Sequence, residues 1–276
     1  MNSNLIALLT DFGIDDPYVG IMKGIISEIA PTTQLIDLTH QIPPGDIQRG
    51  AFVLWQAAKD LPEGTVFLCV IDPGVGSERK AIIMETGGQT FIGPDNGLFS
   101  YLLYNSQFNC WELSNPQYQR TSSSVTFHGR DIFAPAAAHA SKSISGGQFG
   151  PPVNSIHNLS VPTLNLIESS ITGEILSWDH FGNLFTSIGL FTYQNEVLSY
   201  KSWIENSEIS IRDISAIRIK VNDQNLPFVK TFASVNKGTS AGLIGSTGLL
   251  EIVANQTSAK SLLGLEKGSV VTLSWE

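Results

Sequence analysis

In the first half of the chain, short apolar runs alternate with longer segments whose apolar residues have helical spacing. Residues 5–11 form an apolar run that ends in Asp, and residues 16–31 place Val, Met and Ile at intervals of three and four before a proline. The same order repeats over residues 33–62, and a third apolar run follows at 65–72. This rhythm predicts an α/β domain with a largely parallel central sheet.

Local signals refine the expected helices. Pro17 fits the first position of the first helix, and Asp15 or Asp16 is a suitable capping residue before it. Residues 97–105 also have a helical pattern.

The pattern changes beyond about residue 165, where short strand-like runs are separated by turn residues. This second part predicts a smaller all-β, barrel-like domain. The segment 146–165 between the two patterns is rich in Gly, Pro, Ser and Asn, as a linker is. We therefore expect an N-terminal α/β domain over residues 1–158 and a C-terminal β-barrel-like domain over 159–276.

Composition argues against several classes of protein. The chain has 276 residues, of which 42% are hydrophobic and 15% charged, so it can bury a sizeable core. The net charge of −9 and the lack of basic runs argue against a nucleic-acid partner. No apolar stretch approaches the roughly 20 residues that span a bilayer, so we expect no membrane association. Cys69 and Cys110 are a poor basis for a disulfide framework, and we expect a cytoplasmic protein.

Several expected strands end in a carboxylate beside glycine. Asp11 precedes Phe-Gly, Asp72 precedes Pro-Gly, and Asp95 lies within Gly-Pro-Asp-Asn-Gly. Because ligands bind at the carboxyl ends of parallel strands, these positions favour a site, although Asp also caps turns in proteins without one. Phosphate-loop, HExxH and CxxC motifs are absent, and the scattered His and Asp residues lack metal-ligand spacing. We expect no metal site.

Asp72, Arg79 and His128 form a chemically coherent trio. An Arg keeps a neighbouring carboxylate ionised, and a His nearby can share a proton. Such a group can orient and polarise water without a metal. A structural salt bridge with a histidine beside it is the alternative interpretation.

Segments spread along the chain resemble one known family. They are "LLTDFGIDDPYVGIMKG", "IDPGVGSER", "IGPDNGL", "TFHGRDIFAPAAAH", "DHFGNLFTSI" and "GSTGLLEIVANQTSA". In this order they resemble the S-adenosyl-L-methionine (SAM) hydroxide adenosyltransferases, which are SAM hydrolases related to fluorinating and chlorinating enzymes. The resemblance implies hydrolysis of SAM to adenosine and L-methionine, with SAM as substrate and no cofactor. It also implies a homotrimer with sites at the interfaces between subunits.

The resemblance implies a role for each matching residue. Asp72 would orient the water, while Arg79 and His128 would polarise it and accept or relay its proton; which of the two takes the proton stays open. Asp11 would bind the ribose hydroxyls, and Asp179 the methionine ammonium. The other expected substrate-binding residues are Asp16, Tyr18, Phe127, Phe181, Asn183, Ser246, Glu251 and Val253.

Two other functions remain possible. Halide-using relatives carry Tyr at the position of Asp72 and lack the trio, so a halogenase that forms 5′-halo-5′-deoxyadenosine fits this sequence less well. A SAM- or adenosine-binding protein without turnover would not need a water-orienting trio. Product analysis distinguishes all three.

Overall fold

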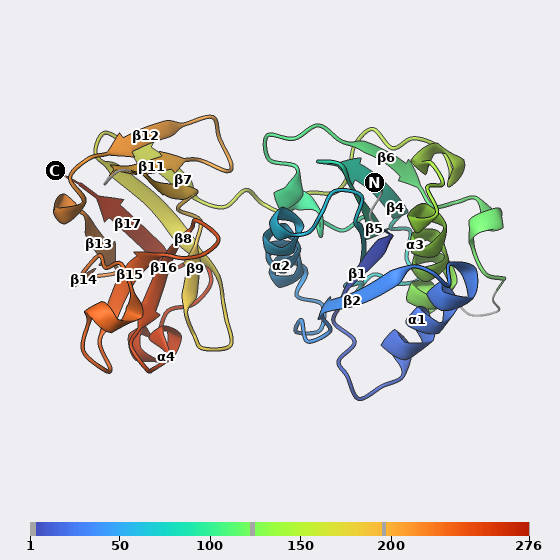
Figure 1. Ribbon diagram of the computed structural model, residues 1–276, viewed down its shortest axis with the longest axis horizontal. Coiled ribbons are helices and arrows are strands. Elements are labelled where there is room, and N and C mark those ends of the chain that lie inside the picture. Colours follow the sequence, from blue (N-terminus) through green and yellow to red (C-terminus); the bar gives the residue numbers. More distant parts are fainter. Residues whose placement is uncertain (1–3, 122–124, 195–196, 276) are drawn as a thin grey trace. The chain divides into compact units, whose positions relative to one another are not determined.

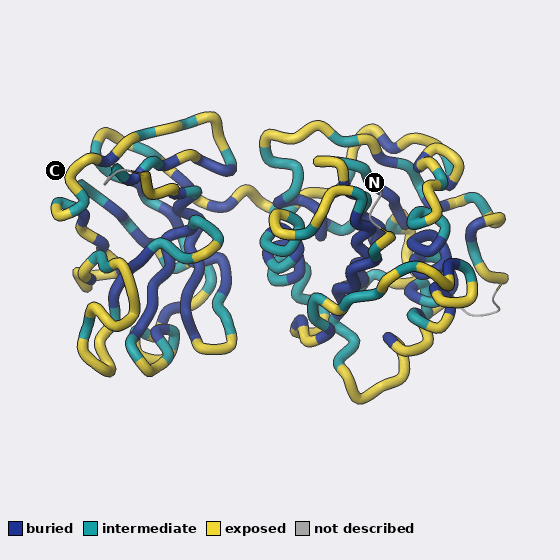
Figure 2. The backbone as a smooth tube through the Cα atoms, viewed as in Figure 1, coloured by how far each residue is buried: buried dark blue, intermediate teal, exposed yellow. Residues whose placement is uncertain are grey.

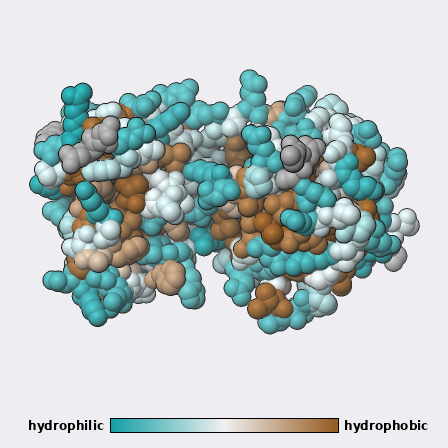
Figure 3. All heavy atoms as spheres, viewed as in Figure 1, coloured by the Kyte–Doolittle hydropathy of each residue, from teal (hydrophilic) through white to brown (hydrophobic). Residues whose placement is uncertain are grey.

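The computed structural model describes residues 4–121, 125–194 and 197–275 (Figure 1). The chain divides into two compact units, Met1–Leu159 and Ser160–Glu276. The strands of both units are largely buried, and most exposed backbone belongs to the connections between them (Figure 2). Hydrophilic residues cover much of the face seen in Figure 3, with hydrophobic residues visible between them in both units.

The first unit is built on one mixed sheet of six strands. In spatial order the strands are β2 (Gln34–Thr39), β1 (Leu5–Thr10), β3 (Val66–Val70), β5 (Gln89–Pro94), β4 (Ala81–Thr86) and β6 (Asn109–Glu112). The first four are parallel to their neighbours, whereas β4 and β6 pair antiparallel. The expected α/β domain with a largely parallel sheet is confirmed, and the antiparallel pairs lie at one edge.

Helices cover both faces of this sheet because alternate strand residues point to opposite sides. Helices α1 (Tyr18–Ile29) and α3 (Ala134–Ser141) pack over a cluster that includes Ile6, Leu8 and Leu68. Helix α2 (Ile47–Asp60) packs with Ala7, Leu9 and Phe67, which point to the other side. A π-helical turn, Gly129–Phe133, leads directly into α3.

Two local expectations were wrong. Helix α1 begins after Pro17, which is itself the capping residue, and no side chain caps the helix. Asp15 and Asp16 instead lie in an exposed loop. Residues 97–105 form only the short 3-10 turn Ser100–Leu102, because the segment begins and ends in left-handed backbone at Gly97 and Asn105.

The second unit is mainly antiparallel. Its larger sheet has the order β14-β13-β17-β8-β9-β16-β15, with β7 also paired to β8, and a smaller sheet has the order β10-β11-β12. Backbone hydrogen bonds between Gly242 of β15 and both Pro227 and Val229, just beyond β14, nearly close the larger sheet. This confirms the expected barrel-like all-β part.

The remaining elements complete the chain. The strands are β7 (Leu164–Ile167), β8 (Ser170–Trp178), β9 (Leu184–Thr186), β10 (Phe191–Gln194), β11 (Val197–Lys201), β12 (Glu208–Ile211), β13 (Arg218–Val221), β14 (Gln224–Leu226), β15 (Ser240–Ile244), β16 (Leu250–Ala254) and β17 (Val270–Ser274), and the helix is α4 (Ala259–Leu263). Further 3-10 turns are Pro116–Tyr118, Gly146–Gln148, Ile214–Ala216 and Phe232–Ser234.

Candidate active site

Three adjacent parallel strands end in the carboxylates that the sequence singled out. Asp11 directly follows β1, Asp72 closely follows β3, and Asp95 follows β5. Asp95 has a structural contact, because its Oδ1 accepts a hydrogen bond of 2.7 Å from the backbone N–H of His157. Asp11 and Asp72 remain as candidates for ligand chemistry at this edge of the sheet.

A tight turn after β3 brings Arg79 back onto Asp72. The N–H of Val75 donates to the carbonyl of Asp72, and the N–H of Ser77 donates to the carbonyl of Gly74. The side-chain hydroxyl of Ser77 also donates to the Gly74 carbonyl, at 2.7 Å. Gly76 has φ +80°, a conformation that favours glycine. The Pro-Gly-Val-Gly sequence therefore folds the chain sharply enough for two charged side chains to meet.

Asp72, Arg79 and His128 lie together. Arg79 Nε lies 2.9 Å from Asp72 Oδ1, and Arg79 Nη2 lies 2.5 Å from Asp72 Oδ2, in the two-pronged geometry typical of strong Arg–carboxylate pairs. Arg79 Nη2 also lies 2.6 Å from His128 Nδ1. The Asp72 and Arg79 side chains are only 4% and 10% exposed, so solvent screens this pair little.

The contact with Arg79 defines the state of the His128 ring. A guanidinium only donates hydrogen bonds, so His128 Nδ1 accepts, and the neutral ring carries its proton on Nε2. Burial lowers the pKa of His128, and the positive charge of Arg79 lowers it further, against the smaller opposing effects of Asp72 and Asp131. The ring is therefore neutral near pH 7 and can donate from Nε2.

His128 is held by the structure that follows it. It immediately precedes the π-helical turn, whose Phe133 ring lies 5.4 Å from the Arg79 guanidinium carbon. Gly129 has no room for a side chain without displacing Met22 or Phe127, since an added Cβ would lie 3.1 Å from each. The turn thus packs tightly against α1 while it presents His128 to Arg79.

A cavity of about 430 Å³ adjoins the trio. Phe12, Tyr18 and Phe127 form part of its wall, with ring centroids 5.3–6.1 Å apart and edges turned toward faces. Such a volume suits part of a small-molecule ligand, with an apolar wall beside buried charges. The lining consists of Phe12, Tyr18, Val70, Asp72, Val75, Thr126, Phe127, His128, Gly129 and Arg130.

Asp11 lies close enough to Asp72 for their charges to interact. Burial raises the pKa of Asp11, and the negative charge of Asp72 adds to the rise, while hydrogen bonds from backbone N–H groups oppose it. One of these donors is Gly45, whose N–H lies 2.8 Å from Asp11 Oδ2. Asp16 lies nearby in sequence but is exposed, as is Tyr18, whose side chain is 44% exposed.

The remaining candidates belong to the second unit. Asp179 and Asn183 lie in the turn between β8 and β9, where the N–H and side-chain amide of Asn183 donate to the two oxygens of Asp179 at 2.9 and 2.8 Å. Phe181, at the tip of that turn, is 74% exposed, so it is not part of the core of this unit.

Glu251 is a buried carboxyl near Asp179. It lies on β16 and is 7% exposed, and among the described residues no hydrogen-bond donor contacts its carboxyl. Burial raises its pKa to about 7, with a further contribution from the charge of Asp179. Ser246 is exposed in the turn before β16, whereas the Val253 side chain is completely buried and leaves only backbone for a ligand contact.

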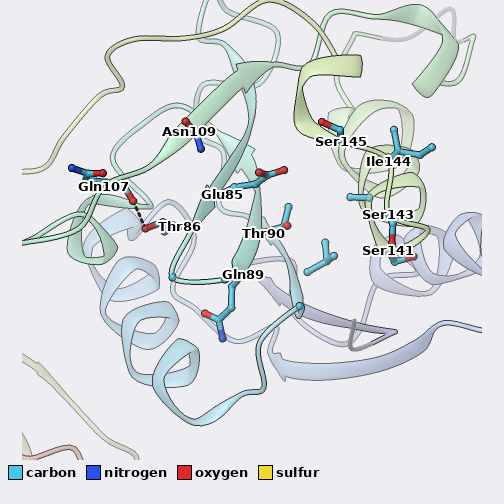
Figure 4. Close-up of a pocket in the computed structure, with 15 residues that line it drawn as sticks. Glu85, Thr86, Gln89, Thr90, Gln107, Asn109, Ser141, Ser143, Ile144 and Ser145 are labelled. Carbon is cyan, nitrogen blue, oxygen red and sulfur yellow. Dashed lines mark hydrogen bonds between the residues drawn. The ribbon is translucent and has the colours of Figure 1, made fainter. Parts of the chain in front are cut away.

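A second cavity, of about 560 Å³, lies at the other end of the strands of the first unit's sheet, away from Asp72 (Figure 4). Strand residues such as Glu85 and Thr90 face residues 141–145 at the end of α3 across it. None of the candidate residues lines this cavity, and it adjoins the amino ends of β3 and β5. We therefore assign the candidate site to the cavity beside Asp72.

Across the described ranges, no group of three His, Cys, Asp or Glu residues is arranged to hold a metal ion. Within the same ranges, no helix is both long and apolar enough to cross a bilayer.

Models of two known domains match this chain. The SAM hydroxide adenosyltransferase N-terminal domain matches residues 6–150, and the C-terminal domain of the same name matches residues 173–272. The chain belongs to the SAM hydroxide adenosyltransferase family. The resemblance seen in the sequence is thereby confirmed.

Similar proteins include both hydrolases and fluorinases. An (R)-S-adenosyl-L-methionine hydrolase of Thermus thermophilus is 36% identical, with 96% of this chain and 97% of the relative aligned. A fluorinase of an Actinoplanes species is more distant, at 24% identity over 98% of this chain and 97% of the relative. A crystal structure of an uncharacterized conserved protein from Thermotoga maritima has a TM-score of 0.83 and 31% identity, covering 98% of this chain and 99% of that one.

Sequence reasoning missed several residues that line the cavity or contact the candidate residues. Phe12 belongs to the quoted Thr-Asp-Phe-Gly segment, so its motif could have identified it as a wall of the cavity. Gly45 carried no comparable signal, because its contact with Asp11 depends on how the loop before α2 folds. Thr126 and Arg130 flank His128 in sequence and could have been inferred from that proximity.

Proposed function

We propose that this family member is a SAM hydrolase, in which water displaces L-methionine from C5′ of the ribose and leaves adenosine. The buried arrangement of Asp72, Arg79 and His128 beside a cavity carries the proposal. Relatives named (R)-S-adenosyl-L-methionine hydrolase, 32–36% identical over nearly the full length, support the same activity here. Because those names specify the (R) form, we propose that form as the substrate.

The reaction makes limited chemical demands on the protein. The sulfonium leaves as a neutral thioether with the electron pair of the C5′–S bond, so no acid must protonate it. The protein must hold the water oxygen in line with that bond at near-attack distance. Groups fixed and shielded from solvent before the reaction do this without reorganising, as the low exposure of Asp72 and Arg79 allows.

The hydrogen bonds within the trio support a division of roles. Arg79 stays protonated and holds the carboxylate of Asp72 in place. His128 cannot take a proton at Nδ1 without losing its contact with Arg79, so we assign to it a donor role toward the water oxygen. As the C5′–O bond forms, the attacking oxygen becomes strongly acidic. Asp72 then stabilises the positive charge that develops and accepts the released proton, which passes to solvent.

Other residues would bind the rest of the substrate. We propose that Asp11 accepts hydrogen bonds from the ribose hydroxyls, since Gly45 engages only one of its oxygens. Asp16 and Tyr18 would border the methionine end, and Phe127 would contribute an apolar wall.

In the second unit, the carboxylate of Asp179, oriented by Asn183, would pair with the methionine ammonium. Exposed Phe181 would stack on adenine. Ser246, Glu251 and the backbone at Val253 would complete these contacts.

We further propose a cytoplasmic homotrimer in which each site draws residues from two copies. The division of the candidate residues between the two compact units of the chain supports shared sites. Two free, buried cysteines fit a reducing compartment. Light scattering coupled to size-exclusion chromatography tests the trimer, which a monomeric mass would contradict.

Product analysis tests the activity. Purified protein is incubated with (R)-SAM and with (S)-SAM in ¹⁸O-water, and the products are separated and weighed by mass spectrometry. We expect adenosine labelled at the 5′ oxygen, unlabelled methionine, and faster turnover of the (R) form. Label-free adenosine would contradict attack of water at C5′.

Parallel incubations separate the rival functions. Added chloride or fluoride should yield no 5′-halo-5′-deoxyadenosine, and substantial halogenated product would overturn the hydrolase assignment. SAM binding in a calorimeter without any adenosine after long incubation would instead indicate a binding protein.

A further inference from the structure

A continuous line of polar contacts runs from the surface to the buried end of β1. Lys23 Nζ lies 2.6 Å from Asp37 Oδ2, and Asp37 Oδ1 lies 2.9 Å from His40 Nε2. His40 Nδ1 lies 2.9 Å from Thr10 Oγ1. Thr10 is completely buried and His40 is 7% exposed, whereas the Asp37 side chain is 43% exposed. None of these residues lines the cavity beside Asp72.

The donors and acceptors along this line agree in direction. The backbone N–H of Phe12 donates to Thr10 Oγ1 at 3.3 Å, so the hydroxyl proton of Thr10 is free to point at His40 Nδ1. With Nδ1 accepting, the ring N–H is on Nε2, which lies 2.9 Å from Asp37 Oδ1. Thr10 Oγ1 thus has a hydrogen-bond partner in both Phe12 and His40, whereas His40 Nε2 is close to Asp37 Oδ1 as an ion pair without forming a regular hydrogen bond.

An irregularity in the sheet directs His40 to this position. β1 and β2 are in register at Leu8 and Asp37, but Leu9 pairs with Thr39, so β2 has one additional residue there. Such a bulge bends its strand and re-aims the side chains that follow. His40 is the residue immediately after β2.

The network holds the backbone next to Asp11. Phe12 donates its N–H to the Thr10 side chain, and Gly13 donates its N–H to the His40 carbonyl at 2.8 Å. Thr10 directly precedes Asp11, and Phe12 directly follows it. The path of the chain through Asp11 is thus fixed from both sides by a pair of residues that do not reach the cavity.

We propose that Thr10 and His40 are positioning residues for nucleoside binding, which act by fixing the loop that carries Asp11. This rests on the proposed function only in that Asp11 contacts the ribose. Asp11 would lose its orientation, and not its charge, if the network were broken. The expected consequence is weaker binding of the nucleoside portion, with little change in the displacement step.

A matched pair of threonines allows a sharp test. Thr65 is also completely buried in the first unit, and its hydroxyl donates to the Pro62 carbonyl at 2.7 Å. It directly precedes β3, however, and so lies at the amino ends of the parallel strands, away from Asp11. Thr10→Val and Thr65→Val each remove a buried hydroxyl while they keep the shape of the side chain. Both should lower the melting temperature, so any difference in ligand binding reports position and not stability.

Adenosine affinity and steady-state kinetics are measured for each variant. We expect Thr10→Val to raise both the Kd for adenosine and the KM for SAM about 5–30-fold with kcat nearly unchanged, and Thr65→Val to leave all three unchanged. Thr10→Ser, which keeps the hydroxyl, should restore wild-type binding. Adding His40→Ala to Thr10→Val should weaken binding no further, since both break one network.

The outcomes separate this inference from the hydrolase assignment. Equal effects of Thr10→Val and Thr65→Val on adenosine affinity would overturn the inference, as would a wild-type protein that binds no adenosine. If Thr10→Val does not fold, Thr10→Ser and His40→Asn supply the same comparison. Wild-type adenosine affinity in His40→Asn and weaker affinity in His40→Ala would then support the inference. A wild-type protein that binds adenosine but does not hydrolyse SAM would refute only the hydrolase proposal.

Discussion

Arg79 Nη2 lies 2.6 Å from His128 Nδ1, so the two side chains are joined by a hydrogen bond in which the imidazole accepts. The same guanidinium holds both oxygens of Asp72. Arg79 is therefore the centre of the trio, and both of its neighbours depend on it for their orientation. This arrangement makes distinct predictions for each member.

His128 should make turnover depend on pH only on the acid side. Its pKa lies below the ordinary value of 6.5, so the ring stays neutral at higher pH and becomes protonated only below that value. Protonation at Nδ1 would break the contact with Arg79 and place two cations together. We expect kcat to be constant from about pH 7 to 9 and to fall below about pH 6.5. A decline that begins between pH 7 and 8 would contradict this assignment, and His157→Asn serves as a control.

Asp72→Asn should remove most of the turnover. The amide keeps the shape of the side chain but loses the charge that, in the proposed mechanism, faces the attacking water. Loss of a positioned group of this kind typically costs about 10²–10³-fold in kcat. Adenosine affinity should change much less. Asp95→Asn is the matched control, because Asp95 follows the neighbouring strand and its carboxylate accepts a hydrogen bond from the backbone N–H of His157. Full activity in Asp72→Asn would refute the mechanism even if the substrate is correct.

Arg79→Lys should be almost as harmful, although it preserves the charge. An ammonium cannot donate simultaneously to two oxygens of Asp72 and to His128 with the geometry of a guanidinium. We expect kcat to fall about 10²-fold. Arg120→Lys, a change at an exposed position, should leave kcat unaffected. Comparable kcat values for the two variants would indicate that Arg79 acts only through its charge.

Glu251 should make the ligand-free protein less stable as the pH rises. Its pKa is raised from 4.5 to about 7, so the folded protein binds this proton more tightly than the unfolded chain does. The associated stabilisation is present below about pH 4.5 and is lost as the pH rises to about 7. Glu251→Gln removes this dependence. The unfolding free energy of the variant minus that of the wild type should therefore be higher at pH 8 than at pH 4.5, by on the order of 2–3 kcal/mol.

Denaturant unfolding at the two pH values measures this difference. Glu266→Gln is the control, because Glu266 is exposed and pairs with Lys260. Equal effects of Glu251→Gln at both pH values would show that Glu251 keeps an ordinary pKa.

The sequence pattern was informative wherever it reports local burial. The alternation of strand and helix, and the change to short strands after residue 165, correspond to the two kinds of sheet that the chain forms. Strand direction was less accessible, because β4 follows β3 in the chain but pairs antiparallel with β5. The capping of α1 failed as a prediction since Asp15 and Asp16 were judged by residue type, whereas the loop places them in solvent.

The candidate site divides in the same way. Asp72 and Arg79 could be paired from sequence, because a short turn with Pro and Gly joins them. His128 is far away in the chain and was grouped with them by its chemistry and its motif, neither of which predicts a direct contact with Arg79 at 2.6 Å. The role of Asp95 was also undetermined, because its partner is a backbone N–H that no residue type reveals.

Asp72 and Arg79 sit on one uninterrupted turn whose two ends are anchored by β3 and β4. The carboxylate and the guanidinium that holds it therefore lie on a single short connection between two strands of one sheet. Replacing residues 72–79 with the corresponding stretch of a fluorinase would exchange the two groups to which we assign the handling of the nucleophile, while the buried strands on either side stay as they are. A chimera of this kind tests whether one loop determines which nucleophile is used, with His128 unchanged outside the exchanged segment.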